Sequence, residues 1–90
     1  MGKYFIKKHC EATEVLCIGL DRVQDYYYGN NPIGGYISRN FTPRSFEIEQ
    51  YGFNSTEEAK PLFLKMLAAV EEENKKGHWN ITLEIVEVNV

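Results

Sequence analysis

The histidines and cysteines of this chain, which can act as zinc ligands or in nucleophilic catalysis, are His9, Cys10, Cys17 and His78. Zinc sites usually draw such ligands in closely spaced pairs. His9 and Cys10 are adjacent, so in a strand their side chains point to opposite faces, and Cys17 and His78 belong to no pair. A cysteine nucleophile also needs its histidine base within hydrogen-bonding reach, and the sequence shows composition only. We therefore expect no metal site and no catalytic residue.

The acidic and glycine residues favour no other catalytic chemistry. Successive positions in Glu71–Glu73 fan out around a helix, so they do not form a paired acid on one face. Glu47 and Glu49 would share one face of a strand, where exposed carboxylates usually keep a sheet edge soluble. Gly34 and Gly35 form an isolated pair rather than a phosphate-binding loop. We expect that the protein is not an enzyme and needs no cofactor.

The strongest candidate for function is a segment rich in tyrosine, glycine and asparagine. Four of the six tyrosines fall within residues 26–36. Tyrosine offers a large rigid contact area with few rotamers to restrict, and glycine and asparagine add adaptable backbone and hydrogen bonds, as in recognition loops. The predicted binding residues are Tyr26, Tyr27, Tyr28, Asn30, Asn31, Tyr36 and Arg39. The alternative is a tyrosine-rich strand followed by a turn, with two of the tyrosines packed on the body of the domain.

Charge is distributed unevenly along the chain. The net charge is −3, with +2 in residues 1–44 and −5 in residues 45–90. An acidic half suits a basic partner surface, whereas binding to a phosphate backbone needs clustered lysine and arginine. Stacking of bases on the tyrosines, with Arg22, Arg39 and Arg44 nearby in sequence, keeps a single-stranded nucleic-acid binder as an alternative. The acidic composition disfavours it.

Periodicity indicates the elements that would position these residues. Apolar residues at every third or fourth position predict a helix over residues 55–76. Ser55 and Glu58 have capping-box spacing, and Gly77 is placed to terminate the helix. Pro61 predicts a distorted or re-started first turn. Alternation and apolar runs predict strands at 3–10, 15–20, 36–39, 45–51 and 79–90, with a long loop over 21–35.

The last predicted strand changes phase. Trp79, Ile81, Leu83 and Ile85 alternate one way, whereas Val86, Val88 and Val90 alternate the other. A bulge at residues 85–86 would place both sets on one face; alternatively, a partner subunit covers the second face. The surplus of apolar strand surface predicts a homodimer through the uncovered face of the sheet, because monomers rarely leave large apolar patches in water.

Composition and element order predict one domain. Ninety residues with 43% apolar and 26% charged side chains suit a single globular core. We predict an α+β domain spanning residues 1–90, with an antiparallel or mixed sheet of about five strands covered on one face by one long helix. The order is strand, strand, strand, strand, helix, strand. The predicted core is Phe5, Leu16, Ile18, Phe46, Ile48, Leu62, Phe63, Met66, Leu67, Val70, Ile81, Leu83 and Ile85.

Function is predicted at the level of class. The leading prediction is a small non-catalytic protein-binding module that acts through the tyrosine segment and an acidic surface. In composition the chain resembles small phage or mobile-element proteins that bind and block a host protein, as an inhibitor or adaptor. The alternative is a small-ligand sensor or small enzyme whose pocket forms between protomers around His9, Cys17 and the tyrosines. With neither a signal-peptide run nor an apolar span, we expect a cytoplasmic location and no membrane association.

Overall fold

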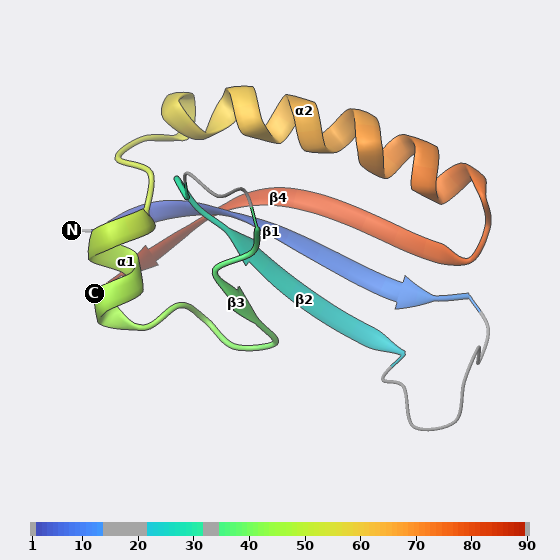
Figure 1. Cartoon of the computed structure of the whole chain (residues 1–90), viewed down its shortest axis with the longest axis horizontal. Coiled ribbons are helices and arrows are strands. Elements are labelled where there is room, and N and C mark those ends of the chain that lie inside the picture. Colours follow the sequence, from blue (N-terminus) through green and yellow to red (C-terminus); the bar gives the residue numbers. More distant parts are fainter. Residues whose placement is uncertain (1, 14–21, 32–34, 90) are drawn as a thin grey trace.

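The computed structural model of the chain describes residues 2–13, 22–31 and 35–89. The elements are β1 (Gly2–Ala12), β2 (Val23–Tyr28), β3 (Ser38–Arg39), α1 (Ser45–Tyr51), α2 (Thr56–Lys75) and β4 (Trp79–Asn89) (Figure 1). The predicted α+β class is confirmed. Within the described residues, however, the sheet has four strands and the helices number two, where we expected about five strands and one helix.

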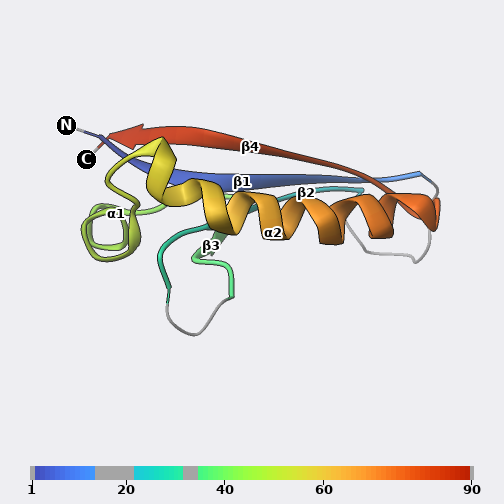
Figure 2. The same ribbon diagram turned by 90° about the horizontal axis from the view of Figure 1, so that it is seen from above.

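The described strands form one antiparallel sheet in the order β3-β2-β1-β4. β1 and β4 pair residue for residue from Gly2 with Asn89 to Ala12 with Trp79, so the bulge expected at residues 85–86 is absent. Gly2 and Asn89 are partners, and the two ends of the chain therefore lie side by side at one end of the molecule (Figures 1 and 2). The sheet is thus a regular platform whose two faces follow directly from the register.

The two faces of the sheet are covered by different helices. Ile6 on β1 is fully buried in a cluster with Phe53 and Ala59, against the α2 side. Its neighbour Phe5 is also fully buried but packs with Ile48 of α1. Adjacent strand residues point to opposite faces, so one strand anchors two cores. α2 packs on β4 and β1 and runs along that side of the sheet, farther from β2 and β3 (Figure 1).

α2 follows the predicted helix closely. Ser55 is its N-cap, and the side chain accepts a hydrogen bond from the Glu58 backbone N–H at 3.2 Å. The Glu58 carboxylate accepts from the Asn54 backbone N–H at 3.0 Å, one residue before the position we expected. Gly77 adopts the left-handed φ of +80° that ends the helix. Pro61 lies inside one continuous helix, so the helix does not re-start there; distortion of its first turn stays a prediction.

Residues 45–51 form α1 and not the strand that their alternation predicted. Residues two apart lie about 200° apart around a helix, whereas in a strand they share a face. Ile48 is buried against Phe5, so Phe46 is turned to the outside and is 59% exposed. Its predicted place in the core is therefore wrong. The Glu47 carboxylate accepts from the Arg44 backbone N–H at 2.9 Å at the start of this helix.

α1 also explains the change of phase in β4. Leu83 and Ile85 pack with the core on the α2 side, whereas Val86 and Val88 pack with Phe5 on the α1 side. The apolar surplus of this strand, from which we inferred a homodimer, is thus covered within the chain at its C-terminal end. The homodimer itself stays a prediction.

The remaining core and strand predictions have mixed outcomes. Phe5, Ile48, Val70 and Ile81 are buried, and Leu62, Phe63, Met66, Leu67, Leu83 and Ile85 are half-buried. The predicted strand at 15–20, with Leu16 and Ile18, lies outside the described residues. The predicted loop over 21–35 contains β2, so part of it is strand.

Candidate functional site

The predicted tyrosine segment is divided between the two faces of the sheet. Tyr26 and Tyr28 pair with Lys8 and Ile6 and lie on the α2 side. Tyr27 lies on the other side and packs with the cluster around Phe5 and Ile48. The alternative of a tyrosine-rich strand therefore describes these three residues better than a recognition loop does. Tyr27 is half-buried, and its replacement would disturb this packing.

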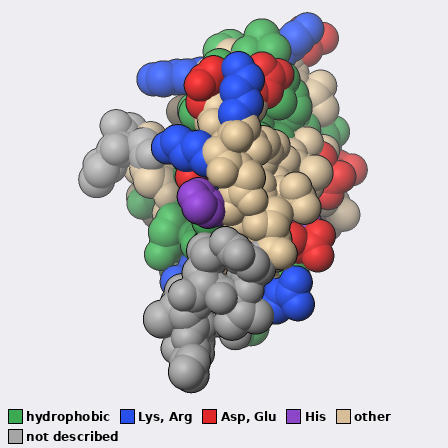
Figure 3. Space-filling model, turned by 90° about the vertical axis from the view of Figure 1, so that its right-hand side faces the viewer, with side chains coloured by type: hydrophobic (Ala, Val, Ile, Leu, Met, Phe, Trp, Pro, Cys, Tyr) green, Lys and Arg blue, Asp and Glu red, His purple; other side chains and the backbone are tan. Residues whose placement is uncertain are grey.

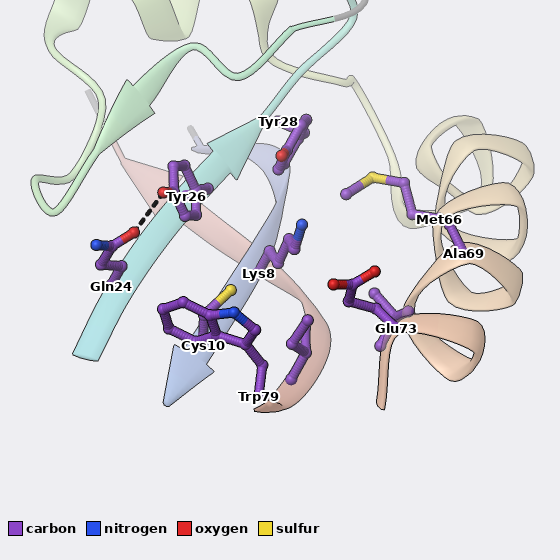
Figure 4. Close-up of a pocket in the computed structure, with 11 residues that line it drawn as sticks. Lys8, Cys10, Gln24, Tyr26, Tyr28, Met66, Ala69, Glu73 and Trp79 are labelled. Atoms are coloured by element: carbon purple, nitrogen blue, oxygen red, sulfur yellow. Dashed lines mark hydrogen bonds between the residues drawn. The ribbon is translucent and has the colours of Figure 1, made fainter. Parts of the chain in front are cut away.

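A groove of about 430 Å³ opens between β2 and α2, because α2 covers β4 and β1 but leaves the α2-facing side of β2 free. Tyr26 and Tyr28 line one side, and Met66 and Ala69 line the helix side (Figure 4). Its other lining residues are Lys8, Cys10, Gln24, Val70, Glu73, Trp79 and Ile81. The Tyr26 hydroxyl donates to the Gln24 side-chain oxygen, which fixes this part of the wall.

The groove contains one cation and one anion, and their surroundings differ. The Lys8 ammonium lies 5.9 Å from the centre of the Tyr26 ring, close enough for a cation–π attraction. The Glu73 carboxylate forms a salt bridge of 3.3 Å with Lys76. Figure 3 shows lysine and glutamate side chains gathered together at this end of α2. Lys76 thus offsets the charge of Glu73, and Lys8 is the cation that the groove itself presents.

Two other polar groups of the groove are neutral at physiological pH. Burial raises the pKa of the Cys10 thiol, so the thiolate that nucleophilic chemistry requires is disfavoured. Burial also raises the pKa of the Tyr28 hydroxyl, which therefore remains a hydrogen-bond donor. The groove accordingly suits binding through donors and apolar contact.

A second surface follows β2 in sequence. Tyr36 packs edge-on against Tyr26, with ring centres 5.1 Å apart, and Arg39 pairs with Tyr26 in the sheet. Asn40 then takes a left-handed φ of +64°. Its backbone N–H donates to the Asp25 carbonyl at 2.8 Å, and its side-chain oxygen accepts from the Asp25 N–H at 2.9 Å. This turn holds the following residue, Phe41, on the surface.

Segment 36–46 carries an unusual concentration of exposed aromatic rings. Tyr36, Phe41 and Phe46 are 48%, 78% and 59% exposed, and among the described residues they are three of the five most exposed large hydrophobic side chains. Arg39 and Arg44 share a hollow of about 600 Å³ with Tyr36 and Phe41, which we call the Arg39–Arg44 hollow. Glu47 supplies the carboxylate at its edge. Neither arginine forms a salt bridge with another described residue.

The other predicted binding residues lie at the end of β2. The Asn30 backbone N–H donates to the Tyr51 carbonyl at 2.6 Å, which ties this turn to α1. The tie needs close approach, since a side chain at Gly29 would meet the Tyr51 carbonyl oxygen at 2.5 Å. Asn30 is exposed and Asn31 half-buried. Neither residue lines the groove or the Arg39–Arg44 hollow, so the predicted residues are grouped in sequence and only partly in one surface.

His9 lies away from the groove, on the α1-facing side of the sheet. Its ring nitrogen Nδ1 is 2.6 Å from the Asp25 carboxylate, and Nε2 is 3.5 Å from Glu11. Hydrogen bonding to Asp25 is the main cause of its raised pKa. His9 and the groove tyrosines therefore do not share a pocket, and Cys17 lies outside the described residues. Within residues 2–13, 22–31 and 35–89, no three metal-binding side chains are grouped closely enough to hold an ion.

Sequence reasoning missed Phe41 and Phe46 as surface residues, and it considered Arg44 only for the nucleic-acid alternative. The available signal was the composition of residues 36–46, where aromatic residues and arginines alternate with Ser, Asn, Thr and Pro. Aromatic residues and arginine are enriched at interaction surfaces. The assignment of 45–51 to a strand hid it, because a strand places Phe46 beside Ile48 in the core.

In the part of the chain that the structure describes, no helix combines the length and apolar character needed to span a bilayer. No family model matches the chain, and no curated protein and no solved structure matches it, so the candidate site stands on its own geometry.

Proposed function

We propose that this protein is a non-catalytic binding module that captures a partner protein through the Arg39–Arg44 hollow. The observation that carries this proposal is the exposure of three aromatic rings within eleven residues, beside two arginines without salt bridges to other described residues. Burying such rings against a partner is favourable at about 25 cal/mol per Å² of apolar surface. Tyrosine, tryptophan and arginine are also the residues most enriched at binding hot spots.

The local charge indicates the chemistry of the partner. Two guanidinium groups face one carboxylate in the hollow, whereas the chain as a whole has a net charge of −3. Arginine forms two parallel hydrogen bonds with a carboxylate, so this surface suits a segment that presents Asp or Glu beside an apolar side chain. The partner surface expected here is therefore acidic, and it differs from the basic surface that we expected from the acidic half of the chain.

The hollow is supported by a firm framework. Ile37 donates its backbone N–H to the Tyr27 carbonyl at 2.7 Å, and the Ser38 hydroxyl donates to the Phe41 carbonyl at 2.7 Å. The first bond joins the exposed segment to β2, and the second holds Phe41 within the segment. Less conformational entropy is then lost on binding, which favours affinity.

Site-specific photocrosslinking in a lysate of the source organism tests this function. A photoreactive phenylalanine analogue is placed at Phe41 or, as a matched control, at Leu64, an exposed apolar position on α2. We expect one protein to crosslink strongly from position 41 and not from position 64. The crosslinked peptide of that protein should contain Asp or Glu.

Substitution then measures the contribution of the hollow. Against the purified partner, Arg39→Ala combined with Phe41→Ala should weaken binding at least about 30-fold, because each hot-spot residue typically contributes more than about 1 kcal/mol. Leu64→Ala should leave binding unchanged. Retention of full affinity by the double variant, with its melting temperature equal to that of the wild type, would show that the hollow is not the binding site.

A nucleic-acid role is tested with the same double variant. Phe41 and Tyr36 beside two arginines could also stack on single-stranded bases. Binding of a mixed-sequence oligonucleotide with a steep salt dependence, weakened by the double variant, would assign the hollow to nucleic acid and overturn the protein-binding proposal.

A further inference from the structure

Lys8 occupies a position where a strand residue normally packs in the core. Its neighbours on the same face of β1 are the buried Ile6 and Cys10, and its partners across the sheet are Tyr26 and Leu83. Lysine is almost never fully buried unless its charge is paired, and Lys8 is half-buried. Among the described residues the Lys8 ammonium forms no salt bridge, and it lies 5.9 Å from the centre of the Tyr26 ring. A cation is therefore held over the groove, with apolar residues on both sides of it in the strand.

Lys8 forms no salt bridge with the described residues. Glu73 extends into the same space from α2 (Figure 4). Its carboxylate, however, forms its salt bridge with Lys76. Cys10 and Tyr28 are neutral, and Tyr28 adds a hydroxyl donor. Beside Glu73, which is paired with Lys76, the groove offers one cation without a salt bridge to any described residue and one neutral donor, and this combination favours a ligand with a single anionic group.

The remaining lining sets the shape of that ligand. Along the helix side the groove runs from Met66 to Glu73, a distance of about 10 Å at 1.5 Å per residue. Val70 and Ile81 are buried, and Trp79 lies near the far end. A volume of about 430 Å³ lies within the range of small-molecule sites. An apolar chain or flat ring system lying along the helix would fill this space.

We propose that the groove between β2 and α2 binds a small amphipathic carboxylate, whose anionic group contacts Lys8 and whose apolar body lies against Met66, Val70 and Trp79. The residues that line this site differ from those of the Arg39–Arg44 hollow, although Tyr26 of the groove packs against Tyr36 of the hollow. The proposal does not depend on the protein-binding role proposed for the hollow. The carboxylate accepts hydrogen bonds from the Lys8 ammonium and the Tyr28 hydroxyl. The apolar body replaces water over residues that already form the core.

The chain provides its own reporter for this site. Trp79 is the only tryptophan, and it lines the groove. Titration with decanoate, below the concentration at which it forms micelles, should produce a saturable change in Trp79 fluorescence. The uncharged analogue 1-decanol should produce the same change only at higher concentration, because it lacks the anionic group.

Two substitutions at neighbouring lysines form a matched pair. Lys8→Met removes the cation but keeps an apolar stem of similar length, whereas Lys7→Met makes the same change on the opposite face of the sheet. Lys8→Met should raise the dissociation constant for decanoate at least about tenfold, and it should leave that for 1-decanol unchanged. Lys7→Met should bind decanoate like the wild type.

A third variant keeps the proposal testable if Lys8→Met does not fold. Ala69 is exposed on α2 and lines the groove, so Ala69→Phe fills the space from the helix side. It should abolish the response to both probes. Equal decanoate affinity in the wild type and in Lys8→Met would overturn the proposal. So would a fluorescence change that does not saturate, or one that persists in Ala69→Phe.

Discussion

The groove between β2 and α2 and the Arg39–Arg44 hollow are both lined by aromatic and cationic side chains, but they differ in how far their residues belong to the hydrophobic core. The floor of the groove consists of buried residues such as Val70 and Ile81, so it is part of the hydrophobic core. The hollow is formed by a segment whose aromatic rings face solvent and which is held mainly by backbone hydrogen bonds. Stability and binding should therefore be linked in the groove and separable in the hollow.

The largest expected effect separates the two regions by their contribution to folding. Ile81→Ala removes a buried side chain from the groove floor and should lower the free energy of unfolding by about 2–5 kcal/mol. Phe41→Ala removes a larger side chain that is 78% exposed, and it should change that free energy by less than about 0.5 kcal/mol. Urea denaturation of both variants measures the difference. Similar losses of stability would mean that Phe41 packs in solution and that the contrast is false.

An intermediate effect is expected at the turn that positions Phe41. Asn40→Ala places alanine at a φ of +64°, where a Cβ atom is strained and alanine has no polar side chain to form local hydrogen bonds. It also removes the side-chain oxygen that accepts from the Asp25 N–H. The cost should be about 1–2 kcal/mol. Asn40→Gly relieves the backbone strain and should cost less than Asn40→Ala.

The effect of the Asn40 substitutions should be confined to the Arg39–Arg44 hollow. Trp79 fluorescence, which reports on the groove, should be the same in both Asn40 variants as in the wild type. Affinity for the partner should fall more in Asn40→Ala than in Asn40→Gly, in the same order as their losses of stability. An altered Trp79 spectrum would show that the two surfaces are coupled, against the comparison above.

The smallest expected effect concerns His9, on the side of the sheet opposite the groove. Asp25 and, to a smaller extent, Glu11 raise the pKa of His9, so folding favours its protonated form. The resulting stability is fully present below the ordinary histidine pKa of about 6.5 and is lost as pH rises through the raised value. Because the group is partly exposed, the change should be under about 1 kcal/mol.

A pH series distinguishes this contribution from others. The free energy of unfolding of the wild type should fall relative to that of His9→Gln between pH 6 and 8.5, while decanoate binding in the groove should keep its Lys8 dependence throughout. His78→Gln serves as the control for the other histidine. An unchanged difference between the wild type and His9→Gln across this range would contradict the proposed role of Asp25.

Elements whose signals are local were predictable. The long amphipathic stripe, the Ser55 cap and the terminating Gly77 together specify α2, because each acts within one or two turns of the chain. β1 and β4 were also recognised from their apolar alternation. The position of the tyrosines was harder to predict, since three consecutive tyrosines suit a strand and a recognition surface equally well.

The misassignments arose where a pattern has two structural meanings. In residues 45–51, Ile48 alone needs burial, and seven residues are too few to separate a period of two from a period of 3.6. The phase change in β4 likewise reads as a bulge or as a second covered face, and only the position of α1 decides between them. The groove depends on the same kind of information, because it exists only where α2 lies over β4 and β1 and leaves β2 uncovered.

Local chemistry alone thus specified an acidic α+β chain with one capped helix, long flanking strands and a concentration of tyrosines. Hydrogen-bond spacing, capping and amphipathic periodicity involve residues close together in the chain, so the amino-acid sequence alone reveals them. The faces to which Tyr26 and Tyr27 point, the exposure of Phe46 and the meeting of Lys8 with Trp79 were decided by tertiary packing. Each of these depends on pairing and coverage between segments distant in sequence, and no local period encodes which helix covers which face.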